Sequence, residues 1–256
     1  MTEINSFRTR KNSIYNRTAK DPFKISRSKF FNFLNCKRCF YLDRVIGLKE
    51  LSSPPYTLNN TVDELLKKEF DYYRKLKQPH PIMVNNNLKF IPYHNENLDI
   101  WRNSLKGGIS FHDEKTNLII HGGIDDIWFD LNNNKLVVVD YKAQSSSYPV
   151  TASSYLSSEW RVSYKVQMDI YVYILRKMKY EVSDITYFYV CNAEKNSDKF
   201  DDKIRFKTSL IPYKTDTTWI ESKIIDMKNT LDCKDIPEIN INCEKCMYLK
   251  GGSKFF

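Results

Sequence analysis

The stretch "IHGGIDDIWFDLNNNKLVVVDYKAQSS", residues 120–146, reads as two apolar β-strands joined by an asparagine-rich turn. Paired strands of this kind bury apolar side chains, yet the first carries Asp125 and Asp126 and the second carries Asp140 and Lys142. Burying a charged side chain costs free energy unless a partner compensates it. These charged residues are therefore the first candidates for a functional site.

The turn decides which of these side chains face each other. If Asp130 pairs with Lys135, the same register puts Asp125 directly opposite Asp140, with Cβ atoms about 5 Å apart. Lys142 lies two residues further along and shares that face. A wider turn that sets Asp125 against Lys142 still leaves all three on one face. The second acid of the first strand points to the other face and is expected to be a bystander.

A divalent cation would compensate two opposed carboxylates, which otherwise repel each other. Hard oxygen ligands select Mg²⁺ or Mn²⁺, and an ammonium group beside the cation can orient water and offset charge at a phosphorus centre. The alternative is an exposed, salt-bridged sheet face. The apolar run "LVVV" before Asp140 and the glycine pair before Asp125 favour the functional interpretation. That function is metal-assisted hydrolysis of phosphodiester bonds.

The rest of the chain alternates between helical and strand-like patterns. Ser26 or Ser28 can cap a first helix that Gly47 ends. Further helices are expected at residues 57–78, 96–106, 159–178 and 217–232, and strands at residues 108–114, 117–130, 135–143, 185–193 and 203–213. This order predicts an α/β fold in which helices flank one central mixed sheet.

Composition limits the classes of protein to which the chain can belong. Its 256 residues, 41% of them hydrophobic, suffice for one domain with a sizeable core. The formal charge of +9 suits a polyanionic partner, although a solvated lysine-rich surface accounts for it equally well. No segment is apolar enough for a membrane span. Residues 1–24 are polar and basic, which predicts a flexible arm rather than a secretion signal. We therefore expect a cytoplasmic protein without a membrane partner.

Four of the six cysteines form two C-x-x-C pairs, Cys36/Cys39 and Cys243/Cys246. Four thiolates suit tetrahedral Zn²⁺ or an iron–sulfur cluster. Two pairs, one near each end of the chain, predict a metal site that joins the ends, whereas a redox dithiol needs only one pair. The isolated cysteines, Cys191 and Cys233, are expected to be small buried apolar residues.

The motifs "GGID", "DYK" and "QMDIY" resemble the PD-(D/E)XK nuclease superfamily, in particular its RecB-like branch. The order of elements matches over about residues 26–250, and the motifs match over about residues 120–175. The resemblance implies a restriction-endonuclease-like core with a helical N-terminal lobe in one domain, residues 25–256. It also implies a deoxyribonuclease that uses Mg²⁺ or Mn²⁺.

Within this resemblance the hairpin residues take defined roles. Asp125 and Asp140 match the two metal-binding acids, and the backbone carbonyl of Tyr141 matches a further metal ligand. Lys142 matches the catalytic lysine.

The flanking helices supply the remaining matches. Gln167 and Tyr171 correspond to the helix motif of the branch, and their spacing of four places both on one helical face, with Tyr164 one turn earlier. Packing in the core explains the tyrosines almost as well as function does. Asp63 stands where the branch often has a metal-binding histidine, and it can ligate Mg²⁺ or Mn²⁺ or support its helix end through the dipole.

Relatives with similar cysteines, among CRISPR-adaptation exonucleases and AddB-like helicase–nucleases, hold a [4Fe–4S] cluster with one early and three late ligands. The arrangement of two and two in this chain leaves Zn²⁺ open.

Three functions compete at this stage. The first is an exonuclease-like enzyme that acts on single-stranded DNA or duplex ends in repair, recombination or replication. The second is a nucleic-acid-binding scaffold with a decayed site, and the intact set of Asp125, Asp140 and Lys142 argues against it. The third is a redox or zinc-binding regulator, which leaves the hairpin unexplained. Because the chain has no helicase motif, a helicase or recombination partner would be a separate protein.

Overall fold

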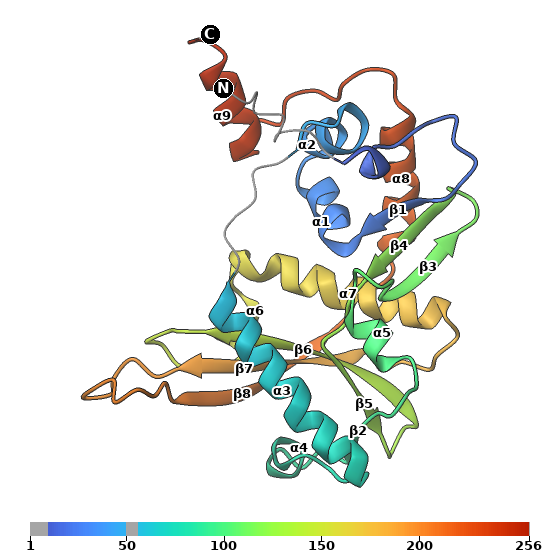
Figure 1. Ribbon diagram of the computed structural model, residues 1–256. Coiled ribbons are helices and arrows are strands. Elements are labelled where there is room, and N and C mark those ends of the chain that lie inside the picture. The colour runs from blue at the N-terminus through green and yellow to red at the C-terminus, as the bar shows by residue number, and fades with distance from the viewer. Residues whose placement is uncertain (1–9, 50–55, 256) are drawn as a thin grey trace. The chain divides into compact units, whose positions relative to one another are not determined.

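The computed structural model describes residues 10–49 and 56–255 (Figure 1). Contacts between residues divide the chain into two compact units. Unit 1 consists of the described parts of Met1–Pro54, Phe111–His121 and Thr218–Phe256, and unit 2 consists of those of Pro55–Ser110 and Gly122–Thr217. Both units are α/β in character, because each combines a sheet with helices.

Unit 2 is built on a five-stranded sheet with the strand order β2-β5-β6-β7-β8. Its strands are β2 (Phe90–Pro92), β5 (Asp126–Asp130), β6 (Lys135–Gln144), β7 (Ile185–Ala193) and β8 (Phe206–Lys214). Its helices are α3 (Thr57–Leu76), α4 (Pro81–Asn85), α5 (Leu98–Arg102), α6 (Ala152–Leu156), the 3₁₀ turn η4 (Glu159–Arg161) and α7 (Val162–Lys177). Since β6 and β7 are parallel and the other pairs antiparallel, the sheet is mixed, as the sequence predicts.

The β5–β6 hairpin has the predicted register, with Asp130 opposite Lys135 and Asp126 opposite Val139. The expected single strand over residues 117–130 is wrong, however. Its first half, β4 (Leu118–Gly122), belongs to another sheet, and its second half is β5. The chain leaves one sheet for the other at residues 123–125, so Asp125 lies in the link between two strands.

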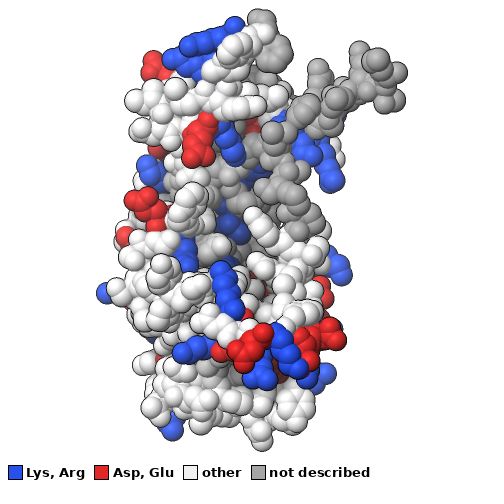
Figure 2. All heavy atoms as spheres, turned by 90° about the vertical axis from the view of Figure 1, so that its left-hand side faces the viewer, with Lys and Arg blue, Asp and Glu red and all other residues white. Residues whose placement is uncertain are grey.

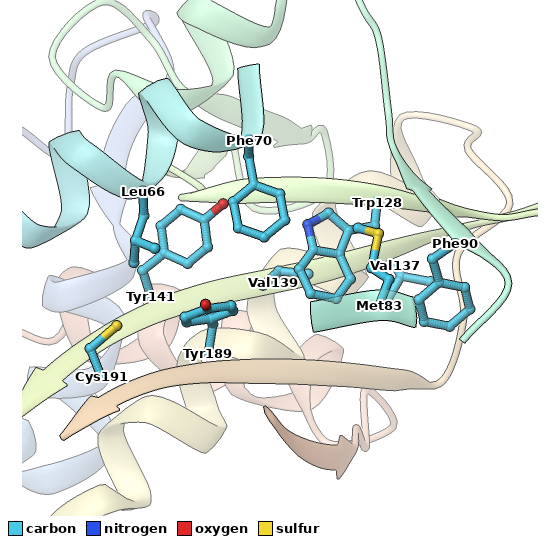
Figure 3. Close-up of a cluster of buried hydrophobic side chains, with 10 residues drawn as sticks. All are labelled: Leu66, Phe70, Met83, Phe90, Trp128, Val137, Val139, Tyr141, Tyr189 and Cys191. Carbon is cyan, nitrogen blue, oxygen red and sulfur yellow. The ribbon is translucent and has the colours of Figure 1, made fainter. Parts of the chain in front are cut away.

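Helices cover both faces of the five-stranded sheet (Figure 1). On one face, Phe70 of α3 stacks on Trp128 of β5 with ring centroids 5.3 Å apart, above Val137 and Val139 of β6 (Figure 3). On the other face, α7 buries every residue from Gln167 to Leu175. Residues 136–141 of the central strand β6 are therefore buried, so a charged residue among them lies in the interior.

Unit 1 contains the three-stranded sheet β1-β4-β3 and several helices. Besides β4, these elements are η2 (Lys11–Ser13), β1 (Phe23–Ser26), α1 (Arg27–Asn35), α2 (Lys37–Tyr41), the π-helix η3 (Leu42–Ile46), β3 (Ile109–Asp113, which spans the unit boundary), α8 (Ile220–Asp232) and α9 (Glu244–Gly252). The Ser26 hydroxyl accepts a hydrogen bond from the Lys29 amide and caps α1, and Gly47, with φ of +83°, ends η3. Both boundaries were expected from the sequence, but the expected single helix between them is divided into α1, α2 and η3.

The predicted flexible arm, residues 1–24, lies partly outside the described residues. In its described part, the Tyr15 hydroxyl donates a 2.7 Å hydrogen bond to Asp232 at the end of α8. The Arg17 guanidinium hydrogen-bonds the hydroxyl of Tyr41 at 3.0 Å. The described part of the arm therefore packs on the helices of unit 1. Within the same described residues, no helix is long and apolar enough to cross a lipid bilayer.

Candidate active site

Strand β6 carries two charged side chains into the interior of unit 2. The Asp140 side chain is 1% exposed and the Lys142 side chain 17% exposed, and the two form an ion pair on the face covered by α7. The Lys142 ammonium also lies 4.6 Å from the centre of the Tyr164 ring. Alternation along the strand places both side chains on this face and the Tyr141 side chain on the opposite one.

The link between β4 and β5 places Asp125 beside β6. The Asp125 carboxylate accepts a 2.9 Å hydrogen bond from the backbone amide of Tyr141. The backbone carbonyl of Asp125 accepts a 3.1 Å hydrogen bond from the Arg102 guanidinium. A Cβ atom on Gly123 would lie only 2.9 Å from the Arg102 carbonyl oxygen. The glycine thus allows a close approach of two backbone segments, and this approach fixes the position of Asp125.

Helix α3 contributes a third carboxylate, Asp63. Lys67, one turn later, lies 2.6 Å from Asp63 and 3.8 Å from Asp125. Asp63 therefore lies beside the acid predicted to bind the metal. We call Asp63, Asp125 and Asp140 the carboxylate cluster.

Helix α7 supplies the two residues of the predicted helix motif. The Gln167 side-chain amide donates a hydrogen bond to one oxygen of Asp140, and Gln167 is only 5% exposed. Tyr171 is 3% exposed and lies one turn further along the same helix. The structure thus brings Gln167 into the carboxylate cluster and buries Tyr171 in the helix behind it.

Burial and mutual repulsion shape the electrostatics of the cluster. Burial, together with the neighbouring Asp125 charge and against the opposing effect of Lys142, raises the pKa of Asp140 to about 7. Burial and the Asp125 charge also raise the pKa of Asp63. Although burial lowers it, the pKa of Lys142 is raised overall by Asp140 and Asp125. The negative charge of the cluster is therefore incompletely compensated.

Two oxygen atoms of the cluster are candidate ligands for a cation. Asp63 Oδ1 and Asp140 Oδ2 are buried without a hydrogen-bond donor, although the Lys142 ammonium forms an ion pair with the latter. Buried polar atoms are normally satisfied. Carboxylate oxygens are the ligands that Mg²⁺ and Mn²⁺ take. Asp63, Asp125 and Asp140 are the residues that would hold the ion.

The predicted cysteine site forms within unit 1. The cysteine quartet, Cys36, Cys39, Cys243 and Cys246, has all its sulfur atoms within 4.8 Å of one another. Cys36 is the N-cap residue of α2, and Cys39 lies in the first turn of this helix. Cys243 and Cys246 occupy the same two positions in α9. The quartet could hold a metal ion or a cluster, and it joins segments from the two ends of the chain.

The two isolated cysteines behave differently from each other. Cys191 is buried in the core beside Tyr189 (Figure 3), as expected. Cys233 is exposed at the end of α8, so the expectation of burial is wrong for it. Its position after the last helical residue, where the chain turns outward, accounts for the exposure.

Comparison with known proteins identifies the family. The model of the PD-(D/E)XK nuclease superfamily matches residues 57–250, which is more than half of the chain. The chain belongs to the PD-(D/E)XK nuclease superfamily. Among curated proteins, none matches this chain. One solved structure, titled "Crystal structure of SSO0001", is 13% identical over 92% of this chain and 87% of that chain, with a TM-score of 0.33. That similarity is too low to support an argument.

Membership of the superfamily indicates the class of substrate and the fold. Its nuclease domains act on nucleic acids with divalent metal ions, so a nucleic acid is the substrate class and the fold is that of a PD-(D/E)XK nuclease. The structure brings Asp125 together with the run Asp140–Tyr141–Lys142.

Lys67 and Asp126 make contacts that were not predicted from the sequence. Asp126 points away from the cluster as predicted, but it is fully buried and is bound by Arg74, Arg102 and the Tyr141 hydroxyl. It therefore fastens β5 to α3 and α5. A signal for Lys67 was present in its spacing of four from Asp63.

Proposed function

We propose that this member of the superfamily hydrolyses phosphodiester bonds of DNA with Mg²⁺ or Mn²⁺ held by Asp63, Asp125 and Asp140. The observation that carries the proposal is the convergence of three carboxylates from α3, the β4–β5 link and β6 with the Lys142 ammonium. The Tyr141 carbonyl, 3.5 Å from that ammonium, is the proposed backbone ligand. Structural ion-pair networks rarely leave buried carboxylate oxygens without donors.

The residues of this chain have separate roles in the proposed reaction. A bound divalent ion would supply Lewis-acid polarisation of the phosphate and a more acidic water molecule. The Lys142 ammonium orients the attacking water and offsets the negative charge that develops on the phosphate oxygens. Gln167 holds one oxygen of Asp140, and the other oxygen, which pairs with the Lys142 ammonium, would ligate the ion. Tyr171 supports the Gln167 face of α7 from within the core.

Substrate contact is best supported around η4 and the loop after β6. Trp160, which precedes α7, is 91% exposed, and Tyr148 is 81% exposed. Tyr148 borders a cavity of about 530 Å³ that Lys207 and several serine residues also line. Exposed aromatic rings beside lysine residues suit the stacking of unpaired bases and the binding of phosphates. These features favour single-stranded DNA or a frayed duplex end as the substrate.

The overall charge supports this role only in part. The formal charge is +9, but Figure 2 shows lysine and arginine side chains scattered over the face that it presents, with acidic side chains next to several of them. On this face the charges do not guide a nucleic acid to one place. Local contacts such as stacking must therefore position the strand.

The finer assignment to the RecB-like branch rests on the helix motif of Gln167 and Tyr171, and it includes both units, residues 25–256, in one nuclease domain. An exonuclease that works beside a separate helicase or recombination protein in DNA repair, recombination or replication follows from that resemblance. Linear and covalently closed single-stranded DNA of equal length distinguish the cleavage modes. An exonuclease degrades only the linear form, and cleavage of the closed circle would refute this mode.

We also propose that the cysteine quartet holds one tetrahedral Zn²⁺. Three sulfur pairs of the quartet lie 3.5–3.7 Å apart, and Zn–S bonds of about 2.3 Å place sulfurs about 3.8 Å apart around a single ion. A [4Fe–4S] cluster attaches each sulfur to a different iron and spreads the sulfurs further. Reduced thiols of this kind suit the cytoplasm. Metal analysis of purified protein should give one zinc per chain without absorbance near 400 nm; iron with that absorbance would refute zinc.

The nuclease proposal is tested with labelled single- and double-stranded DNA in the presence of Mg²⁺ or Mn²⁺. We expect wild type to cleave, and Lys142→Ala and Asp140→Ala to be slower by at least ~100-fold, because each removes a group that stabilises the transition state. Lys68→Ala, an exposed position of α3, is the matched control and should retain activity. Binding without cleavage by wild type would instead indicate a nucleic-acid-binding scaffold.

A further inference from the structure

Lys67 occupies an unusual position in the carboxylate cluster. Its ammonium lies 2.6 Å from Asp63 Oδ2 and 3.8 Å from Asp125 Oδ1, and thus bridges acids from α3 and from the β4–β5 link. The Lys67 side chain is 22% exposed, and those of Asp63 and Asp125 are 29% and 21% exposed. A lysine between two predicted metal ligands stands where a cation is needed.

An ordinary salt bridge between neighbouring turns of a surface helix does not explain this arrangement. Such a pair involves two exposed residues of one helix and adds little stability. Here the second acid comes from a distant segment of the chain, and the other oxygen of Asp63 is buried without a donor. Lys67 is therefore part of the site, and its role is not limited to stabilising α3.

The charge of Lys67 changes the number of divalent cations that the site needs. The three carboxylates and the two ammonium groups, Lys67 and Lys142, carry one net negative charge when all are ionised. One divalent cation turns this into one positive charge, which a single phosphodiester group neutralises. Two divalent cations would leave three positive charges in a largely buried site, and such an excess is costly.

We propose that Lys67 takes the place of a second metal ion, so that the site uses a single divalent cation. The inference rests on the proposed nuclease function and adds a residue and a metal stoichiometry to it. In the protein without metal, the Lys67 ammonium pairs with Asp63 and Asp125, so an incoming cation must compete with it for these carboxylates. With nucleic acid bound, the same ammonium offsets charge on the phosphate.

The two roles have opposite consequences for a variant without the charge. Lys67→Met keeps most of the side-chain length but removes the competitor, so Mn²⁺ should bind about tenfold tighter to the metal-free protein. Cleavage at saturating Mn²⁺ should fall by about 10- to 100-fold, because the positive charge at the phosphate is lost. Tighter metal binding with slower cleavage is a combination that a merely structural role of Lys67 does not produce.

Titration of chelator-treated protein with Mn²⁺ alone, followed by electron paramagnetic resonance, tests the inference. Wild type should bind one Mn²⁺ that Asp140→Ala abolishes; the soft thiolates of the quartet select other metals. Lys67→Arg keeps the charge and should bind Mn²⁺ like wild type. Lys68→Met, with the same charge change at the adjacent exposed position, should match wild type in both affinity and cleavage.

The outcomes separate this inference from the proposed function. Two Mn²⁺ ions bound at the wild-type cluster, or an unchanged or weaker affinity in Lys67→Met, would overturn the single-cation site while leaving the nuclease intact. Wild-type protein that binds no Mn²⁺ would overturn both. The wild-type stoichiometry and the Lys67→Arg titration remain decisive if Lys67→Met folds poorly.

Discussion

At the scale of single residues, the active site depends on side chains that hold other side chains. Asp125 is fixed by the Tyr141 amide, and Asp140 is fixed by Gln167. A ligand that is oriented in advance loses less freedom when a cation binds, so supporting residues of this kind influence metal affinity and rate.

Gln167 provides a test of this support. Replacing it with leucine removes the donor to Asp140 and should lower the rate of cleavage by about 10- to 100-fold, because the carboxylate loses its orientation. Initial rates and Mn²⁺ affinity, measured beside the melting temperature, distinguish positioning from unfolding. Gln78→Leu, at an exposed position beyond α3, is the control. Full activity in Gln167→Leu would show that the hydrogen bond has no catalytic consequence.

At the scale of elements, the site depends on how the chain passes from β4 to β5. Gly123 packs against the backbone of Arg102 and Ser104, and the next polar residue is Asp125. The segment after β6 and the start of α7 form the other border, where Trp160 is exposed.

Gly123→Ala should damage both stability and activity. The added Cβ would lie 2.9 Å from one backbone atom and 3.0 Å from another, so the link must shift and the free energy of unfolding should fall by ~1–3 kcal/mol. Cleavage should fall as well, because Asp125 moves with the link. Gly251→Ala in α9 meets no atom within 4 Å and is the matched control. Equal melting temperatures for wild type and Gly123→Ala would contradict the predicted crowding.

Trp160→Ala tests the proposed stacking surface. Loss of one stacked base should weaken binding of single-stranded DNA by about 5- to 100-fold, since such a contact contributes ~1–3 kcal/mol. Trp160→Phe retains an aromatic face and should recover most of the affinity. Fluorescence anisotropy with a short labelled strand gives both values. An affinity for single strands that does not change in the alanine variant would remove Trp160 from the substrate path.

At the scale of the whole molecule, the cysteine quartet and the carboxylate cluster lie in different compact units. The quartet links α2 with α9 across about 200 residues of chain, and a metal clip over so long a loop stabilises the fold by several kcal/mol in chain-entropy terms. Burial raises the pKa of the Cys36 and Cys39 thiols, so metal binding must also displace protons.

Cys246→Ala should therefore impair folding more than chemistry. We expect a lower melting temperature, a lower yield and loss of the bound metal, because only three thiolates remain. The fraction that stays folded should cleave within a few-fold of wild type when supplied with Mn²⁺. Cys233→Ala changes an exposed cysteine outside the quartet and controls for simple loss of a thiol. A yield and melting temperature equal to those of wild type would rule out a stabilising metal site.

The local features of this protein follow from the amino-acid sequence alone. Alternation along β6, the turn that pairs Asp130 with Lys135, and the cap and end signals at Ser26 and Gly47 are set by neighbouring residues, and they were predicted correctly. The fold class and the approach of the four cysteines were predicted as well. Short-range sterics and hydrophobic periodicity operate within a few residues and can be read directly.

Three features arise only once the chain is folded: the break in the strand over residues 117–130, the binding of two arginines by Asp126, and the bridge that Lys67 forms between Asp63 and Asp125. Each of these depends on contacts between segments that lie far apart in the chain. A local pattern cannot show which distant backbone crowds a glycine, nor which acid a lysine will meet once α3 packs against the sheet.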